Sequence, residues 1–406
     1  MFSAYSVLFR TPGAIKFSLA GIIARMPVSM DSLALIFIVV AASDSYALAG
    51  ALSATASIVV SIAMPYWARV SDRIGQRALL MRVLPIKLIG LSVFLALVLN
   101  HAPTWTWFIS IIIAESTSVN LGGLVRRRWL HILNSDKSDR HLVNTAYSLE
   151  ALNDEFVFIA GPIIATACAT SIHPAAGLIA GMLFLIIGVP LFALQSATQP
   201  PASPKRTIDP HPHVIQRKSL QAIVLPTLFI GAFFGAVAIV TVSFTDELGH
   251  KSQSGLLLAL WACGSAIAAI LNGLIKWRIS HATRFIIFLI SLTLLSVPFL
   301  FVNSIFWLAV ALFFNGFAIA PLIVGAYGVA ETAVPSEQIT EALSWVIAGM
   351  PLGGAISSAT AGWVIDNYGA QTAYWLPLGF MTAALVATLP YFTTYKQLIG
   401  YSSQHD

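Results

Sequence analysis

The sequence is poor in charged residues and in cysteine. Only 10% of its 406 residues are charged, against about 25% in soluble domains, whereas 57% are hydrophobic and the mean hydropathy is +0.83. So few charged side chains cannot cover the water-exposed surface of a 43.5 kDa protein, which excludes an ordinary soluble enzyme. The two cysteines, Cys168 and Cys263, lie in apolar runs and provide no disulfide framework. We therefore expect most of the surface to face lipid.

The sequence also lacks the common motifs of catalytic and nucleotide-binding sites. It contains no Gly-Lys dipeptide, which excludes a P-loop, and no HExxH, GxSxG or GxGxxG pattern. Histidine and cysteine never cluster at the spacings of metal ligands, so we expect no metal and no cofactor. An intramembrane hydrolase, with Ser, His and Asp converging from distant helices, is an alternative that no motif supports.

Long hydrophobic runs, separated by Pro, Gly and charge, predict an all-α membrane protein. A spanning helix needs about 20 apolar residues, and the chain has room for about twelve such helices. We place them at 15–41, 47–69, 79–99, 104–125, 142–169, 174–194, 222–245, 253–275, 284–302, 305–327, 340–365 and 371–394. The stretch 195–221 is rich in Pro and has no apolar face, so it is interpreted as a flexible linker between six-helix halves at 1–194 and 222–406.

The basic residues gather in connections of one parity, which indicates the orientation in the membrane. They are Arg10 and Lys16 before the first helix, Arg69, Arg73, Arg77, Arg82 and Lys87 around the second connection, Arg126, Arg127, Arg128, Lys137 and Arg140 in the fourth, four in the linker, Lys276, Arg278 and Arg284 in the eighth, and Lys396 in the tail. By the positive-inside rule, both termini and the linker are cytoplasmic in a multi-pass protein of the plasma (inner) membrane. The net charge of +5 is thereby explained without nucleic acid.

A decapeptide at the end of the second predicted helix, Ala68 to Arg77, has the sequence ARVSDRIGQR. In it Gly75 permits a tight turn, Asp72 provides an anion at a helix end, and Arg73 and Arg77 are cations free to pair across the cytoplasmic face. The decapeptide resembles the Gly-x-x-x-Asp-Arg-x-Gly-x-Arg signature of the major facilitator superfamily, with alanine in place of the first glycine.

A degenerate copy of the signature, shifted by 205 residues, ends the eighth predicted helix. There Gly273, Arg278 and Ser280 align with positions of the first copy, although the acid is missing. The resemblance implies two six-helix bundles related by a pseudo-two-fold axis, and a secondary transporter that works by alternating access. It also implies that the first copy forms a cytoplasmic latch. In the fifth helix, Gly161 and Pro162 are similar to the Gly-Pro element of antiporter members and predict a bend, but the element's further glycines are replaced and the subfamily stays unassigned.

Apart from the basic residues assigned above to connections and Glu341 at a helix end, six ionisable residues lie within predicted spans, all in the first half: Arg25, Asp31, Glu115, Glu150, Asp154 and Glu155. Each costs about 2.5 to 3.5 kcal/mol near the bilayer centre, so each needs a partner, a proton or a water-filled cavity. On the fifth helix Tyr147, Glu150 and Asp154 share one stripe, while Glu155 points about 100° away. Because carboxylates one turn apart repel each other when both are ionised, this helix is suited to carrying a proton.

We hypothesise that Arg25 exchanges partners among Glu115, Asp154 and Glu155 as protons bind and leave; a static ion network is the alternative. The second half contributes Trp261, Asn315 and Trp345 as candidate cavity residues. An acidic first half and an aromatic second half predict proton-coupled efflux of amphiphilic cations by a monomer whose partners are substrate, protons and lipid. Uptake of a polar metabolite such as a sugar or amino acid, and a non-transporting receptor or scaffold, are the alternatives.

Overall fold

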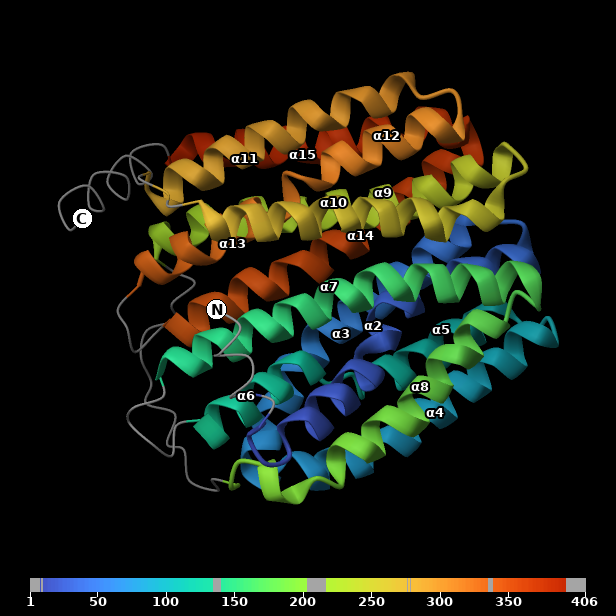
Figure 1. Cartoon of the computed structure of the whole chain (residues 1–406). Helices are drawn as coiled ribbons and strands as arrows, with labels where there is room; N and C mark the ends of the chain where they lie inside the picture. The colour runs from blue at the N-terminus through green and yellow to red at the C-terminus, as the bar shows by residue number, and fades with distance from the viewer. Residues whose placement is uncertain are drawn as a thin grey trace. The chain divides into compact units, whose positions relative to one another are not determined.

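The computed structural model describes residues 8, 10–133, 140–202, 217–275, 277, 279–334 and 339–391 (Figure 1). The secondary structure of these residues is helical. The α-helices are α2 (Ala14–Ser43), α3 (Tyr46–Ile74), α4 (Gln76–Leu99), α5 (Thr104–Glu115), α6 (Leu121–Leu133), α7 (Arg140–Ser171), α8 (Ala176–Ala193), α9 (Lys218–Glu247), α10 (Ser254–Leu274), α11 (His281–Ser296), α12 (Ile305–Gly316), α13 (Ile319–Thr332), α14 (Ile339–Ala373) and α15 (Trp375–Thr388). Short 3₁₀ turns follow several of them, among them η1 (Ser196–Thr198) and η4 (Val297–Phe301).

The helices account for each predicted span. Within the described residues, nine spans are long and apolar enough to cross a membrane, and one further pair, Trp345–Ala373 and Trp375–Tyr391, passes the same test together with a bend of 87°. Helix α5 is apolar but has only 12 residues, and it forms the predicted fourth span together with α6. The predicted all-α, polytopic fold is confirmed.

Two predicted helices are broken. The fourth span was expected to be continuous over 104–125, but α5 ends at Glu115 and α6 begins at Leu121. The tenth span, expected over 305–327, is interrupted between α12 and α13. In the first break, the hydroxyls of Ser116 and Thr117 donate to carbonyls of the last turn of α5, and the Asn120 side chain accepts from the N–H of Gly123 at 2.9 Å. Such short polar side chains compete with the helical hydrogen bonds of the backbone, which explains the interruption.

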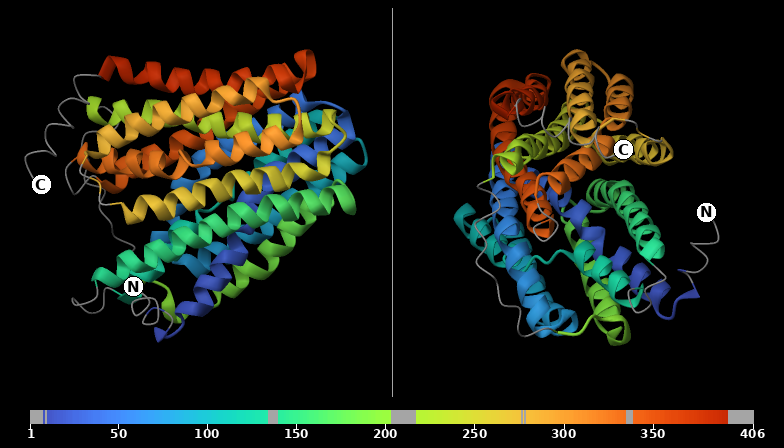
Figure 2. Two further views of the ribbon diagram at one scale, coloured as in Figure 1. Left: turned by 45° about the horizontal axis from the view of Figure 1, so that its top comes forward. Right: turned by 90° about the vertical axis from the view of Figure 1, so that its left-hand side faces the viewer.

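The described chain divides into two compact units. Unit 1 comprises residues 1–42 and 59–208, and unit 2 comprises 43–58 and 209–406. Helix α3 therefore begins in unit 2 and continues in unit 1. The domain boundaries given above stay a prediction, because residues 203–216 of the linker lie outside the described residues, as do Lys137, Lys276, Arg278 and Lys396. Figure 2 shows the helices of each unit running alongside one another.

Close helix contacts at glycine lie beside both breaks. In unit 1, a Cβ on Gly90 of α4 would lie 2.8 Å from the Ala114 backbone of α5. In unit 2, Gly264 of α10 and Gly316 of α12 face each other so closely that a Cβ on either would overlap the partner's backbone. Small residues let membrane helices approach in this way. The contacts bring polar side chains of α4 and α10 to the ends of α5 and α12, respectively.

Candidate functional site

A buried ion network joins α2, α6 and α7 in unit 1. Arg25 is only 3% exposed, and its two terminal nitrogens lie 2.5 Å from Glu150 Oε2 and 2.7 Å from Asp154 Oδ1. The second oxygen of Asp154 pairs with Arg126 of α6 at 2.6 Å. We call Arg25, Arg126, Glu150 and Asp154 the Arg25 cluster. It combines two guanidinium groups with two carboxylates, so its charges balance.

Glu150 is the most completely satisfied acid of this cluster. It is fully buried, and its Oε1 accepts hydrogen bonds from Ser18 Oγ and from Trp129 Nε1, both at 2.8 Å. A buried pair of this kind is held firmly, because removing one partner leaves an uncompensated charge in a medium of low dielectric. The predicted pairing of Arg25 with Asp154 is present, and Glu150 is a further partner that the hypothesis of partner exchange did not include.

The other predicted partners of Arg25 lie elsewhere. Glu115 pairs with Lys87, and Glu155 makes no hydrogen bond or ion pair among the described residues. The charges of Glu155 and Asp154 interact unfavourably when both are ionised. Tyr147 is exposed, so of the predicted stripe only Glu150 and Asp154 contact Arg25. Arg126 was assigned to a cytoplasmic connection because it is the first of three consecutive arginines after the apolar run, and its pairing with Asp154 was therefore not predicted.

The predicted helix bend lies in α7 next to α2. Pro162 is inside the helix, and a Cβ on Gly161 would lie 3.0 Å from Ser29 Cβ of α2. Ser29 Oγ donates to the carbonyl of Val157 at 2.7 Å. Gly161 thus permits the close approach of α2 that brings Arg25 to α7, while the bend itself stays a prediction.

A second group of ionisable side chains lies at the break between α5 and α6. Lys87 Nζ is 2.9 Å from Glu115 Oε2 and 3.0 Å from Ser118 Oγ, and Ser118 in turn donates to Glu115 at 2.5 Å. Asp31 of α2 is close enough to interact electrostatically with both Lys87 and Glu115. We call Asp31, Lys87, Glu115 and Ser118 the Lys87 cluster. The assignment of Lys87 to a cytoplasmic connection is wrong: it occupies the middle of α4, and its side chain is mostly buried.

In unit 2 the predicted polar residues meet at the equivalent break. Trp261 Nε1 donates to Asn315 Oδ1 at 2.9 Å, and Asn315 donates to Ser296 Oγ at 3.3 Å. The indole also lies 5.9 and 5.5 Å, between ring centroids, from Phe233 and Phe234 of α9. Asn315 is fully buried. Trp345, in contrast, is 39% exposed and makes no hydrogen bond or ring contact within the described part of the chain.

The latch signature lies at the turn between α3 and α4. Gly75 has a φ of +86°, a left-handed conformation that favours glycine, and it directly precedes α4. Asp72 pairs with Arg127 of α6, and the side chains of Arg73 and Arg77 are exposed. From the sequence, Arg127 was interpreted only as one of the basic residues that set the orientation in the membrane. In the structure it pairs with Asp72, the acid of the signature.

Arg128 anchors the start of the linker to this turn. Its buried guanidinium donates to Gln76 Oε1 at 2.8 Å, and to the Gln195 carbonyl and Thr198 Oγ1 at 3.1 Å each. It also lies 3.8 Å from the Phe192 ring centroid, and burial lowers the pKa of Arg128 to about 10. Residues 195–202, expected to be flexible, therefore include a fixed segment, because a buried cation needs the acceptors that they supply.

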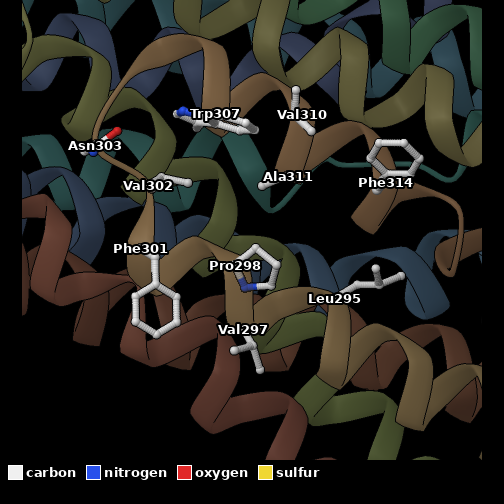
Figure 3. Close-up of a pocket in the computed structure, with 10 residues that line it drawn as sticks. All are labelled: Leu295, Val297, Pro298, Phe301, Val302, Asn303, Trp307, Val310, Ala311 and Phe314. Atoms are coloured by element: carbon white, nitrogen blue, oxygen red, sulfur yellow. The ribbon is translucent and has the colours of Figure 1, made fainter.

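A pocket of about 630 Å³ lies in unit 2 between η4 and α12 (Figure 3). Among its ten lining residues, only Asn303 and Trp307 carry a polar side-chain atom. Without an acid or a base in its lining, this pocket offers nothing to proton chemistry.

Comparisons with known proteins agree with this architecture. Residues 224–403 match the family model described as Major Facilitator Superfamily. The structure of the nucleoside transporter NupG is similar, with a TM-score of 0.70 and 14% identity over 93% of this chain and 98% of that one. An auto-inhibited POT family peptide transporter has a TM-score of 0.73 and 12% identity, covering 95% and 97%. The structure of a bacterial homologue of the iron transporter ferroportin is also similar, with a TM-score of 0.70 and 11% sequence identity over 93% of this chain and 98% of that one. Among curated protein sequences, none matches.

The C-terminal part of the chain thus matches the family by sequence, and nearly the whole chain has its fold. The match agrees with the predicted resemblance to the major facilitator superfamily over residues 224–403, and the subfamily stays unassigned. The solved structures that share the fold are described as transporters, and with the family match they support the prediction of secondary transport of a small molecule.

Proposed function

We propose that this protein is a proton-coupled transporter that exports amphiphilic cationic compounds by alternating access. The observation that carries the proposal is the different pairing of two neighbouring acids of α7: Asp154 is shared by Arg25 of α2 and Arg126 of α6, while Glu155 has no cation of its own among the described residues. When both acids are ionised they repel each other, and one proton relieves the repulsion.

The chemistry of the cycle follows from these contacts. A proton on Glu155 leaves Asp154 ionised and held by both arginines. If the proton instead resides on Asp154, both of its ion pairs weaken, and Arg25 keeps only Glu150. The balance of the Arg25 cluster thus depends on where one proton resides. Coupling requires such a dependence, because a bound proton shifts a conformational equilibrium only through its different affinity for the two states.

The direction and the substrate class are proposed from the polarity of the two units. The acids predicted within spans lie in unit 1, and in unit 2 the indole of Trp261 packs with Phe233 and Phe234. Carboxylates attract a cation, and aromatic rings bind its apolar body and the face of a positive charge. An organic cation with an aromatic skeleton has a group that each kind of residue can bind. The signature around Asp72 is proposed to act as the cytoplasmic latch, with Arg127 as the partner of Asp72.

The test is flux in proteoliposomes that contain the full chain, with ethidium as the probe. Vesicles loaded at pH 6 and diluted into pH 8 are expected to accumulate ethidium, and an uncoupler is expected to abolish the accumulation. Asp154→Asn and Glu155→Gln are each expected to remove the dependence on the gradient. Glu331→Gln, at an exposed acid, is the matched control. If both α7 variants keep full gradient dependence, the proton role is wrong.

The alternatives give different results in the same vesicles. Uptake of a polar metabolite predicts accumulation of labelled glucose or alanine when the gradient is reversed. A receptor or scaffold predicts no flux of any of these probes and no effect of Asp72→Asn on conformational exchange. Turnover of a labelled compound without vectorial movement would indicate a hydrolase.

A further inference from the structure

We propose that the pocket between η4 and α12 binds one acyl chain of a membrane phospholipid (Figure 3). In this arrangement the ester end of the lipid lies at Asn303 and Trp307, and the chain runs inward past Ala311 to Leu295 and Phe314. All of these residues belong to unit 2, and the site shares no residue with the Arg25 and Lys87 clusters. The proposal does not depend on the proposed function.

The polar end of the pocket lies at the membrane boundary. Residues 302–304 connect two segments that are apolar enough to cross a membrane, His281–Phe301 and Ile305–Thr332. So short a connection between two spans lies at the surface of the bilayer. Trp307, in the first turn of α12, is exposed, and an exposed tryptophan near the end of a span is typical of the membrane–water interface. Asn303 and Trp307 therefore lie where the ester groups of lipids are found.

Beyond this boundary the pocket continues along α12 between apolar side chains. Figure 3 shows Val310 and Phe314 of α12 on one side, and Leu295 of α11 with Pro298 of η4 on the other. From Trp307 to Phe314 the helix rises about 10 Å, which is roughly a third of a hydrocarbon core about 30 Å thick. A pocket with a polar end at the boundary and an apolar interior fits an amphiphile whose chain points into the bilayer.

Two local features of the sequence create the space. Helix α11 ends at Ser296, and Pro298 in the following 3₁₀ turn has no N–H with which to continue the helix. On α12, Ala311 is buried and contributes only a methyl group, whereas the rings of Phe301 and Phe314 are exposed. The pocket therefore has a small residue at its base and aromatic rings at its rim.

The rim is continuous with the surface of unit 2 that faces lipid. Leu294 and Phe306, sequence neighbours of the lining residues Leu295 and Trp307, are exposed apolar side chains within candidate spans. Such side chains contact acyl chains when the helices cross the bilayer. Water would find few polar partners in this lining, and the volume of about 630 Å³ lies within the range of small-molecule sites, about 300 to 1,000 Å³. The adjacent lipid therefore supplies the occupant.

The lining also indicates which part of the lipid is recognised. None of the ten lining residues is charged, whereas selectivity for an anionic headgroup depends on basic pockets. Asn303 and Trp307 carry N–H donors, and the ester carbonyls that phospholipids share can accept from them. We therefore expect phosphatidylcholine and phosphatidylglycerol to bind alike.

The inner end of the pocket lies next to a buried hydrogen bond. Leu295 and Phe314 precede Ser296 and Asn315 in the sequence, and Asn315 donates to Ser296 Oγ at 3.3 Å. An acyl chain in the pocket contacts both helices that this hydrogen bond joins, α11 and α12. Because a ligand that binds only the folded state stabilises it, lipid is expected to raise the melting temperature.

The test is photo-cross-linking of the purified full chain in detergent. The probe is a phosphatidylcholine with a diazirine in the middle of one acyl chain, and peptide mass spectrometry locates the labelled residues. We expect the label to concentrate within residues 295–314, at one lipid per chain. Ala311→Leu is expected to lower this labelling about tenfold, because the larger side chain takes up the volume that the acyl chain needs. Ala167→Leu, the same change at an exposed alanine of α7, is the control and should be labelled like the unchanged protein.

A second variant protects the test against misfolding, since Ala311 is buried. Phe314→Ala removes an exposed ring of the rim, so we expect it to fold and to lower the labelling about threefold through the loss of apolar contact. Phe156→Ala, at an equally exposed phenylalanine of α7, should leave the labelling unchanged. If the folded pocket variants are labelled within residues 295–314 like the unchanged protein, the proposal is overturned.

Melting temperatures provide a measurement that is independent of the cross-linker. Phosphatidylcholine and phosphatidylglycerol should raise the melting temperature of the unchanged protein by similar amounts, and Ala311→Leu should reduce both shifts. A shift with the anionic lipid alone overturns the proposal, and so does label spread evenly over the exposed spans. A second copy of the chain as the occupant would give a dimer in size-exclusion chromatography that Ala311→Leu dissociates, with no label in the pocket, and would likewise overturn it.

Discussion

The Asp366 carboxylate of α14 accepts a hydrogen bond from the backbone N–H of Tyr46, at 2.9 Å, in the first turn of α3. It also accepts from the N–H of Ala47 and from the hydroxyl of Ser45, both at 2.8 Å. Residues of unit 2 thus provide a helix cap through a side chain that is 320 positions distant in the sequence. The first N–H groups of a helix have no partner within it, and the helix dipole favours an anion at this end.

Removal of this cap is expected to lower stability. Asp366→Ala should cost about 1 kcal/mol, the usual range for loss of a capping side chain, and Asp366→Asn should cost less because the amide oxygen still accepts. Thermal unfolding in detergent measures the difference. Asn367→Ala, next to it and exposed, should have a smaller effect. Equal melting temperatures for Asp366→Ala and the unchanged protein would contradict the role of the cap.

Arg25→Gln is expected to destabilise the protein strongly. It leaves Glu150 buried without its cation, and breaking such a pair costs about 3 to 5 kcal/mol. The double variant Arg25→Gln with Glu150→Gln should recover much of this loss, because no buried charge then remains at this pair. Folded yield by size-exclusion chromatography and the melting temperature report both effects. A double variant no more stable than the single one would show that the pair is not the cause.

Trp261→Phe is expected to separate the contribution of the indole's ring packing to stability from that of its hydrogen bond to Asn315. The aromatic packing against Phe233 and Phe234 is largely kept, but Asn315 loses its donor while fully buried. An unsatisfied buried polar group costs about 1 to 3 kcal/mol. Trp345→Phe, at an exposed indole, is the control and should be close to neutral in thermal unfolding.

Gly264→Ala tests the close contact of α10 with α12. Its Cβ would overlap the Phe313 carbonyl, so the helices would have to separate and the Trp261–Asn315 hydrogen bond should be lost. We expect a large drop in melting temperature. Gly379→Ala in α15 meets open space and should instead stabilise the helix, by about 0.5 to 1 kcal/mol. Similar melting temperatures for the two variants would contradict the packing argument.

Arg128→Met is expected to release the start of the linker. The three acceptors at Gln76, Gln195 and Thr198 lose their common donor. Limited proteolysis followed by mass spectrometry should show faster cleavage within residues 195–202. Arg73→Met, which removes an exposed arginine of the same turn, should leave the cleavage rate unchanged.

The sequence predicted the fold better than it predicted which side chains pair with one another between helices. Apolar runs of sufficient length specify membrane helices almost by themselves, so every span was found, and the signature at Asp72 and Gly75 indicated the resemblance with which the family match at 224–403 agrees. Lys87 was assigned to the wrong place because the positive-inside rule considers only the position along the sequence. A basic residue within a few helical turns of a cytoplasmic connection is then grouped with that connection. The packing of α4 against α5 in the structure brings the Lys87 ammonium to Glu115, at 2.9 Å.

The breaks in the fourth and tenth spans were missed for a related reason. Hydropathy averages over a window, and two to five polar or turn-forming residues inside a long apolar run hardly change the mean. Ser116 to Asn120 do contain a signal, since four of these five residues are Ser, Thr or Asn, which hydrogen-bond to nearby backbone. The second break, at residues 317–318, contains no comparable cluster, so the sequence carries no signal for it.

The shortness of α5 has a consequence for how the chain enters the bilayer. Its 12 residues extend about 18 Å, which is well short of a hydrocarbon core about 30 Å thick. The segment that follows contains three consecutive arginines, and each of these resists transfer into lipid. The insertion machinery therefore meets a segment too weakly apolar to partition by itself. We expect it to be retained beside α4 until both enter lipid together, so that the Lys87–Glu115 bond forms during biogenesis.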